Sequence, residues 1–227
     1  MLMLIACLTM LIDHIGAVFF PNVIILRIIG RISMPLYAYS IAQGYIHTHD
    51  RKAYYKRIAI IAMLSQIPYM LTFSTYNLNV CFTWLFGLIW LHLLEIKDET
   101  KYVKIICLTA LAGITCIIPT DYNAYGIVLI PLFYIAEQMK QHKIPVARTA
   151  ILIFALGVMP LPLIPEIVAY YQPFAILAVP FIYIAEKFDF VRPKNKSAKY
   201  IYRYFYPAHL AILAAINICM LLYANPA

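Results

Sequence analysis

The sequence predicts an all-helical membrane protein, and three observations support this fold class. The chain has 227 residues, of which 64% are hydrophobic and 12% are charged, whereas soluble domains carry about 25% charged residues. Its mean hydropathy is +0.80. Long apolar runs recur along the whole chain, with charged residues collected between them. We therefore expect one membrane domain over residues 1–227, because too little polar sequence remains for a soluble domain.

Nine apolar segments account for the expected transmembrane helices. A helix needs about 20 apolar residues to cross a hydrocarbon core of about 30 Å, and most of the segments approach that length. The resulting bundle has about nine transmembrane helices. The segments span residues 2–20, 23–47, 57–73, 79–96, 103–119, 124–139, 147–164, 167–186 and 200–224.

The positions of the basic residues test this count independently. Short cytoplasmic loops retain Lys and Arg, and here every basic residue except Arg27 and Arg31 lies after the second, fourth, sixth or eighth segment. This alternation predicts a cytoplasmic amino terminus and an external carboxyl terminus. It also explains the net charge of +8 through topology and membrane lipids. We expect no nucleic-acid partner, because no basic soluble face accompanies the charge.

The first two segments contain four ionisable residues inside otherwise apolar sequence. They are Asp13, His14, Arg27 and Arg31. A charged side chain at the centre of a membrane costs roughly 2.5 to 3.5 kcal/mol on insertion scales, so such residues usually face a bundle interior or a water-filled cavity. A turn near Asn22 makes the two segments antiparallel neighbours. We therefore expect these polar groups to meet.

The spacing of the four residues suggests how they pair. Arg27 and Arg31 are four residues apart and share one helical face, whereas Asp13 and His14 are consecutive and point in different directions. We expect Asp13 to pair with Arg31 or Arg27, which leaves His14 available as a general base. The structural alternative is a buried Asp–Arg pair that fixes helix packing, with His14 as a core histidine.

The last segment carries a second group of polar residues. Tyr202, Tyr206 and His209 are spaced i, i+4 and i+7 and share a helical face. Tyr202 fits the aromatic belt of a membrane protein. His209 lies about 13 Å along the helix from its cytoplasmic end, at a depth similar to that of Arg31. With Tyr206 it is a candidate for stabilising an oxyanion or relaying a proton.

Other polar residues receive simpler interpretations. Asp121 and Tyr122 lie beside an external loop, where helix caps and interfacial hydrogen bonds are the default roles. We expect no metal ion, because His47 and His49 are two residues apart and diverge on a helix. The first basic loop either binds anionic lipid or holds the phosphates of a cytosolic cofactor. Its cations are Arg51, Lys52, Lys56 and Arg57.

Several short stretches resemble the TraX family of membrane proteins. The matches occur in order and span nearly the whole chain. The family is named for a protein that acetylates the amino terminus of F-pilin, and it is distantly similar to transmembrane acyltransferases such as heparan-glucosaminide acetyltransferase. The stretches are MLIDHIG at 10–16, RIIGRISMPLYAYSIAQGYIHT at 27–48, Arg57, SQIPY at 65–69, NVCF at 79–82, DYNAYG at 121–126 and FYPAHL at 205–210.

The resemblance implies a multi-pass acetyltransferase of the bacterial plasma membrane. Such an enzyme moves an acetyl group from cytosolic acetyl-CoA to an amine or hydroxyl acceptor in or across the membrane. The acceptor would be a pilin-like peptide amino terminus, a glycan or a lipid. His14 would deprotonate the acceptor or carry the acetyl group itself, while the other matching positions shape the site. Those positions are Asp13, Arg31 and His209.

A second hypothesis is a membrane transporter or flippase. In that case the intramembrane polar residues would line a substrate path instead of a reaction site. Transporters often contain inverted repeats, and the sequence has no second half that resembles IDHIG at 12–16. A scaffold that binds another membrane protein is a third possibility, without a sequence feature of its own.

Overall fold

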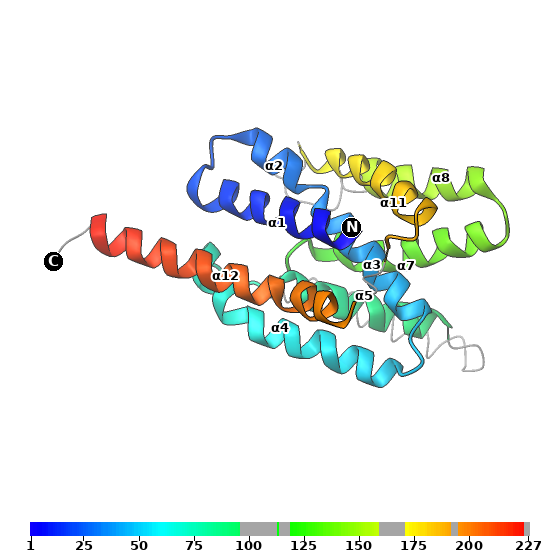
Figure 1. Ribbon diagram of the computed structural model, residues 1–227, viewed down its shortest axis with the longest axis horizontal. Helices are drawn as coiled ribbons and strands as arrows, with labels where there is room; N and C mark the ends of the chain where they lie inside the picture. The colour runs from blue at the N-terminus through cyan, green and yellow to red at the C-terminus, as the bar shows by residue number, and fades with distance from the viewer. Residues whose placement is uncertain (96–112, 114–118, 159–170, 192–194, 225–227) are drawn as a thin grey trace.

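The computed structural model describes residues 1–95, 113, 119–158, 171–191 and 195–224. These residues form helices, apart from connecting turns and one isolated β-bridge between Leu78 and Thr120 (Figure 1). The helices are α1 (Leu2–Phe19), α2 (Ile24–Gly30), α3 (Ser33–Ile46), α4 (Arg51–Phe73), α5 (Val80–Glu95), α7 (Asn123–Gln141), α8 (Pro145–Ile153), the π-helix η1 (Phe154–Val158), the 3-10 helix η2 (Gln172–Leu177), α11 (Ala178–Lys187) and α12 (Lys196–Ala224).

The expected helical fold is confirmed, whereas the expected count of nine spans stays a prediction. Among the described residues, three helical stretches are long and apolar enough to cross a membrane: Leu2–Phe19, Ile24–Ile46 and Ser197–Tyr223. Nearly all of the fifth expected segment, 103–119, lies outside the described residues. Parts of the seventh and eighth segments, at 159–164 and 167–170, also lie outside them.

Helix α4 begins six residues before the segment expected at 57–73. Asp50 caps its amino terminus, because a side-chain oxygen of Asp50 accepts a hydrogen bond from the backbone N–H of Ala53 at 2.9 Å. Such a cap satisfies one of the amide groups that a helix leaves unpaired at its start. Hydropathy missed this charged first turn, whose basic residues include Arg51 and Lys52.

The second expected segment, 23–47, is divided into α2 and α3 instead of forming one continuous helix. The division falls at Arg31 and Ile32. Pro35 explains it, because proline has no N–H to donate to the carbonyl of Arg31 and its ring clashes with that carbonyl. Pro35 is instead accommodated in the first turn of α3. The division lies directly beside the polar residues of this segment.

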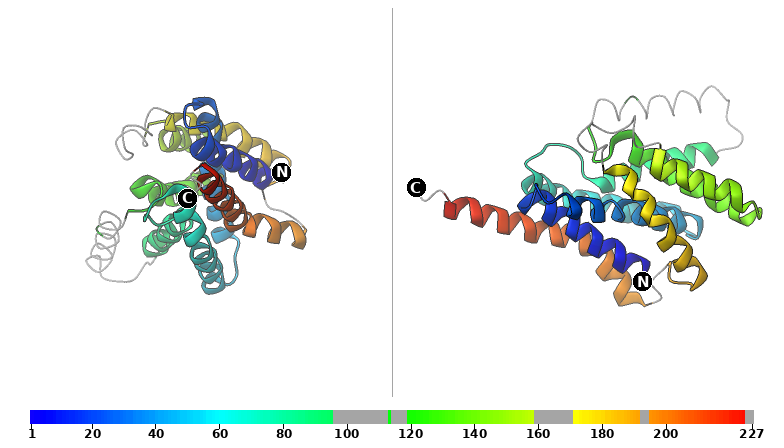
Figure 2. Two further views of the ribbon diagram at one scale, coloured as in Figure 1. Left: turned by 90° about the vertical axis from the view of Figure 1, so that its left-hand side faces the viewer. Right: turned by 90° about the horizontal axis from the view of Figure 1, so that it is seen from above.

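Helices from both ends of the chain pack together at the centre of the bundle. Helix α1 packs against α2, α3 and α12, and α12 runs alongside α4 (Figures 1 and 2). Helix α3 also contacts α7, which packs against α5 and α8. Most side chains of α3 are buried. The first and last helices are therefore brought side by side, although almost the whole chain separates them.

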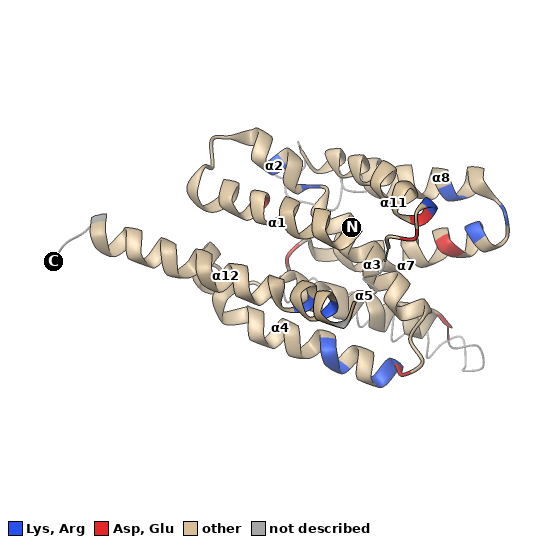
Figure 3. Cartoon of the chain, in the orientation of Figure 1, with Lys and Arg blue, Asp and Glu red and all other residues tan. Residues whose placement is uncertain are grey.

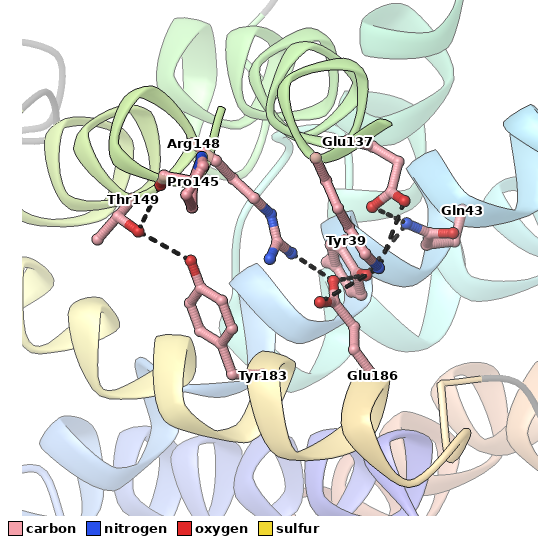
Figure 4. A network of polar contacts seen from close by, with 9 residues as sticks. Tyr39, Gln43, Glu137, Pro145, Arg148, Thr149, Tyr183 and Glu186 are labelled. Carbon is pink, nitrogen blue, oxygen red and sulfur yellow. Dashed lines mark hydrogen bonds and ion pairs between the residues drawn. The ribbon is translucent and has the colours of Figure 1, made fainter. Parts of the chain in front are cut away.

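A polar network fastens α3, α7, α8 and α11 to one another (Figure 4). The carboxylate of Glu186 on α11 accepts hydrogen bonds from Tyr39 and from Arg148. Nearby, the side-chain amide of Gln43 donates to Glu137 at 2.8 Å. The network lies toward the end of the bundle where charged residues gather (Figure 3). The basic residues predict that this end faces the cytoplasm.

Candidate active site

Two histidines from opposite ends of the chain form a buried pair. His14 lies on α1 and His209 on α12, and the Nδ1 atom of His14 is 2.8 Å from Nε2 of His209. Their rings stack, with centroids 5.0 Å apart and an interplanar angle of 17°. The two residues are only 9% and 4% exposed. The pair depends on the packing of α1 against α12.

A third contact determines which ring nitrogens carry hydrogen. Nδ1 of His209 lies 2.8 Å from the backbone carbonyl oxygen of Phe205. A carbonyl oxygen can only accept a hydrogen bond, so Nδ1 of His209 must donate and Nε2 of the neutral ring must accept. Nδ1 of His14 therefore donates to His209. In the neutral pair, Nε2 of His14 is left unprotonated and can act as a base.

The carboxylate of Asp13 is shared by two guanidinium groups. One oxygen lies 2.6 Å from Nη2 of Arg31, and the other lies 2.9 Å from Nη1 of Arg27. Arg27 also donates to the backbone carbonyl of Asp13 at 3.0 Å. The predicted pairing of Asp13 with these arginines is thus confirmed. Asp13 makes its ion pairs away from His14, which contacts His209 instead.

A close approach of two helices makes this arrangement possible. Gly30 ends α2, and a Cβ atom at this position would lie 2.1 Å from the Oδ1 atom of Asp13. Any side chain larger than hydrogen would therefore displace the carboxylate, since real Cβ atoms essentially never come so close to another heavy atom. The absence of a side chain at Gly30 creates the space that Asp13 occupies.

Arg31 is held on several sides and is only 2% exposed. Its Nη1 atom donates to the side-chain oxygen of Gln172 at 3.0 Å. Its guanidinium also lies over the rings of Tyr122 and Tyr171, at 5.7 and 5.6 Å from their centroids, within the range of cation–π attraction. Sequence reasoning missed Tyr171 and Gln172, because neither belongs to a distinctive motif. These contacts favour a positioning role for Arg31.

A cavity of about 340 Å³ opens beside the histidine pair, and we call it the histidine cavity. Its volume is within the range of roughly 300 to 1,000 Å³ typical of ligand pockets. Side chains of α1, of α2 and of the carboxyl-terminal part of α4 line it, together with residues of the two loops that precede α5 and α7. Its lining residues are Asp13, His14, Ala17, Arg27, Arg31, Tyr69, Phe73, Thr75, Asn77, Thr120, Asp121, Tyr122 and Asn123.

Two of these lining residues, Asp121 and Tyr122, were expected only to cap helices or to make interfacial hydrogen bonds. Hydrogen bonds hold their loop against the loop before α5: the N–H of Asp121 donates to the carbonyl of Leu78 at 2.8 Å. Tyr122 and Asn123 have positive φ angles of 64° and 43°, a conformation that often marks functional sites. Enclosure by protein raises the pKa of Asp121 to about 6. The signal that could have found it is the stretch DYNAYG at 121–126.

Tyr206 contacts both histidines but faces a different space. Its ring lies edge-on to His14 and His209, with centroids 6.4 and 5.6 Å away. Instead of lining the histidine cavity, it lines a second cavity of about 300 Å³. We call this second space the basic-end cavity, because Lys199 and Arg203 line it too. Tyr206 therefore stands between the two cavities.

The four cations of the first basic loop, expected to bind either anionic lipid or cofactor phosphates, are not gathered at either cavity. None of them lines the histidine cavity or the basic-end cavity. Arg51 forms an ion pair with Glu95 at 2.8 Å. Lys52 and Lys56 are exposed on α4, and the guanidinium of Arg57 lies over the ring of Tyr54. The structure thus places this group apart from the histidine pair.

Comparison with known proteins agrees with the resemblance seen in the sequence. A curated relative is 24% identical over 243 residues, which cover 94% of this chain and 93% of the relative. It is named "Probable fimbrial assembly protein FimC, serogroup H1" and comes from Dichelobacter nodosus. No solved structure matches the chain significantly. The family model described as TraX protein matches residues 1–217, and the chain therefore belongs to the TraX family.

Proposed function

We propose that this protein is an acetyltransferase of the bacterial plasma membrane in which His14 is the general base. The observation that carries the proposal is the histidine pair, in which His14 lines the histidine cavity and His209 lies hydrogen-bonded behind it. The carbonyl of Phe205 fixes the tautomer of His209, which in turn leaves Nε2 of His14 able to accept a proton. A base whose ring is oriented by a second group is a recurring arrangement in acyl transfer.

The reaction at this site is an acyl transfer from a thioester. The uncharged amine or the hydroxyl of the acceptor attacks the acetyl carbonyl carbon while Nε2 of His14 takes its proton. The new N–C or O–C bond forms, the C–S bond of the thioester breaks, and the thiolate leaves with the electron pair. The proton then passes from His14 to the thiolate, which restores the base. His209 orients His14 throughout.

The charged residues around the cavity have separate roles in this proposal. The guanidinium of Arg27 is partly exposed, with its side chain at 20%, and stabilises the negative charge that develops on the acetyl oxygen. Asp13 holds this guanidinium in place through its carboxylate and its backbone carbonyl, and Arg31 binds the other oxygen of the same carboxylate. Both ring nitrogens of His209 have partners, so Arg27 is better suited to bind an oxyanion than His209 is. Asp121 attracts a cationic amine to the opening.

The proposed donor and acceptor are chosen from the family resemblance and from the name of the relative. TraX family membership supports acetyl-CoA as the donor and a protein or peptide amine as the acceptor. The curated relative is named a probable fimbrial assembly protein, which supports the amino terminus of a pilin-like subunit. A glycan or lipid bearing an amine or hydroxyl would undergo the same chemistry. Intact-protein and lipid mass spectrometry of cells with and without the chain would identify the acceptor by its acetyl mass shift.

Purified protein in lipid nanodiscs tests the proposal directly. With labelled acetyl-CoA and the acceptor identified in cells, we expect His14→Ala to lower the transfer rate about 10²- to 10⁴-fold, as general-base removal does. His142→Ala is the matched control, because His142 is exposed on the turn after α7 and should leave the rate unchanged. Equal transfer by the wild type and His14→Ala would overturn the assignment. Substrate uptake by liposomes without any acyl donor would favour the transporter instead.

A further inference from the structure

The basic-end cavity differs from the histidine cavity in its position in the bundle and in its mostly apolar walls. It lies where α1, α4 and α12 begin and α3 ends, at the end of the bundle that is rich in basic residues. Its walls are mostly apolar. At about 300 Å³ it is at the small end of the range of roughly 300 to 1,000 Å³ for ligand pockets, which suits a narrow chain better than a bulky group.

Two cations line one side of this cavity. Lys199 and Arg203 are four residues apart on α12 and so share a helical face, and both line the cavity. No ion pair joins either of them to an acidic residue within the described ranges. In contrast, Arg51 is already paired with Glu95. Within the part of the chain that the structure describes, Lys199 and Arg203 are therefore the cations that line this cavity and can bind a phosphate group there.

One side chain, that of Tyr206, separates the basic-end cavity from the histidine pair. Tyr206 lines the cavity and is only 3% exposed, while its ring contacts both His14 and His209. Trp84 lies beside it, with ring centroids 6.4 Å apart. A molecule that fills the basic-end cavity would thus end one aromatic ring away from the proposed base.

We propose that the basic-end cavity binds the thioester donor, with the acyl-pantetheine chain in the apolar cavity and the nucleotide phosphates on Lys199 and Arg203. This inference rests on the proposed acetyltransferase function. Tyr206 separates the donor from the histidine cavity and must turn aside before the acetyl carbon can reach the acceptor. The acceptor then enters from the opposite end, through the histidine cavity.

Donors with and without phosphates provide the sharpest test. We expect the double variant Lys199→Ala/Arg203→Ala to raise the KM for acetyl-CoA at least about tenfold, because a charge-assisted hydrogen bond is worth roughly a decade in affinity, and to leave kcat unchanged. Acetyl-pantetheine lacks the nucleotide phosphates, so its KM should not change. Ser40→Phe narrows the cavity and should raise the KM for both donors.

Two control variants test whether losing any cation, or enlarging any side chain of α12, is enough to change the donor KM. Lys187→Ala removes an exposed cation of α11, and Ile212→Phe enlarges an exposed side chain of α12. Both should leave the donor KM unchanged. An unchanged KM in Lys199→Ala/Arg203→Ala would overturn the inference. So would a larger KM increase in Lys52→Ala/Lys56→Ala, since the donor phosphates would then lie on α4.

Direct binding separates failure of this inference from failure of the proposed function. If the wild type transfers no acetyl group but binds acetyl-CoA, and Lys199→Ala/Arg203→Ala weakens binding at least about tenfold, the donor site is supported and the proposed function fails. If the wild type neither binds nor transfers, both fail. A phospholipid that copurifies with the wild type and is lost from the double variant, with the donor KM unchanged, would overturn the inference and identify a lipid site.

Discussion

His14 and His209 make a side-chain hydrogen bond of 2.8 Å although 195 residues separate them. The bond joins the first helix to the last, and the carbonyl of Phe205 completes the chain of contacts. Because these two hydrogen bonds leave Nε2 of His14 unprotonated, the packing of α1 against α12 determines whether His14 can act as a base. Disturbing either helix should therefore disturb the reaction.

Removing the second histidine should weaken the reaction without abolishing it. His209→Ala takes away the acceptor for Nδ1 of His14, so the ring loses one hydrogen bond and its fixed tautomer. A hydrogen bond contributes about 1 kcal/mol, and we expect a rate loss on the order of tenfold, smaller than for His14→Ala. The acetyl-transfer rates of both variants in nanodiscs test this expectation. A larger rate loss in His209→Ala than in His14→Ala would contradict it.

Asp13 and Arg31 should be strongly coupled in stability. Asp13→Asn leaves two buried or partly buried guanidinium groups without their carboxylate, and removing one partner of a buried pair costs about 3 to 5 kcal/mol. The double variant Asp13→Asn/Arg31→Gln should recover part of this loss. Unfolding free energies of the four proteins in detergent give the coupling. Glu95→Gln breaks a more exposed pair with Arg51 and should cost about 1 kcal/mol or less. If the effects of Asp13→Asn and Arg31→Gln on the unfolding free energy simply add in the double variant, Asp13 and Arg31 are not coupled.

Gly30→Ala should destabilise the contact between α1 and α2. Its Cβ atom would lie 2.1 Å from the Oδ1 atom of Asp13, so the carboxylate must move away from Arg27 and Arg31. Overpacking of this kind costs about 1 to 3 kcal/mol. Gly157→Ala is the control, because its nearest neighbour would lie at an ordinary 3.4 Å. Equal thermal unfolding midpoints of the two variants would refute this account of Gly30.

The pH dependence of stability should carry a contribution from Asp121. Its pKa is raised from 3.8 to about 6 by burial, so between these values the folded protein binds a proton that the unfolded chain does not. The stabilising contribution is therefore complete below about pH 4 and is lost as the pH rises through about 6. Asp121→Asn mimics the neutral form, and its advantage in unfolding temperature over the wild type should grow from pH 4 to 7. A constant difference across that range would be inconsistent with the raised pKa.

The sequence predicted the features that depend on neighbouring segments. A turn near Asn22 places α1 and α2 side by side, so the pairing of Asp13 with the arginines could be expected from spacing alone. The helical class followed from the apolar runs. The division at Arg31 was missed because hydropathy does not register the backbone hydrogen bond that Pro35 removes. The start of α4 was missed because its first turn is charged.

The sequence by itself determined which residues are too polar for lipid and which of them share a helical face. Only the tertiary structure decided that His14 makes a direct hydrogen bond with His209, that Asp121 and Gln172 join the site, and that Tyr206 faces a second cavity. The physical reason is that helical periodicity orients side chains within one helix, whereas contact between helices distant in sequence depends on how all of their surfaces pack together.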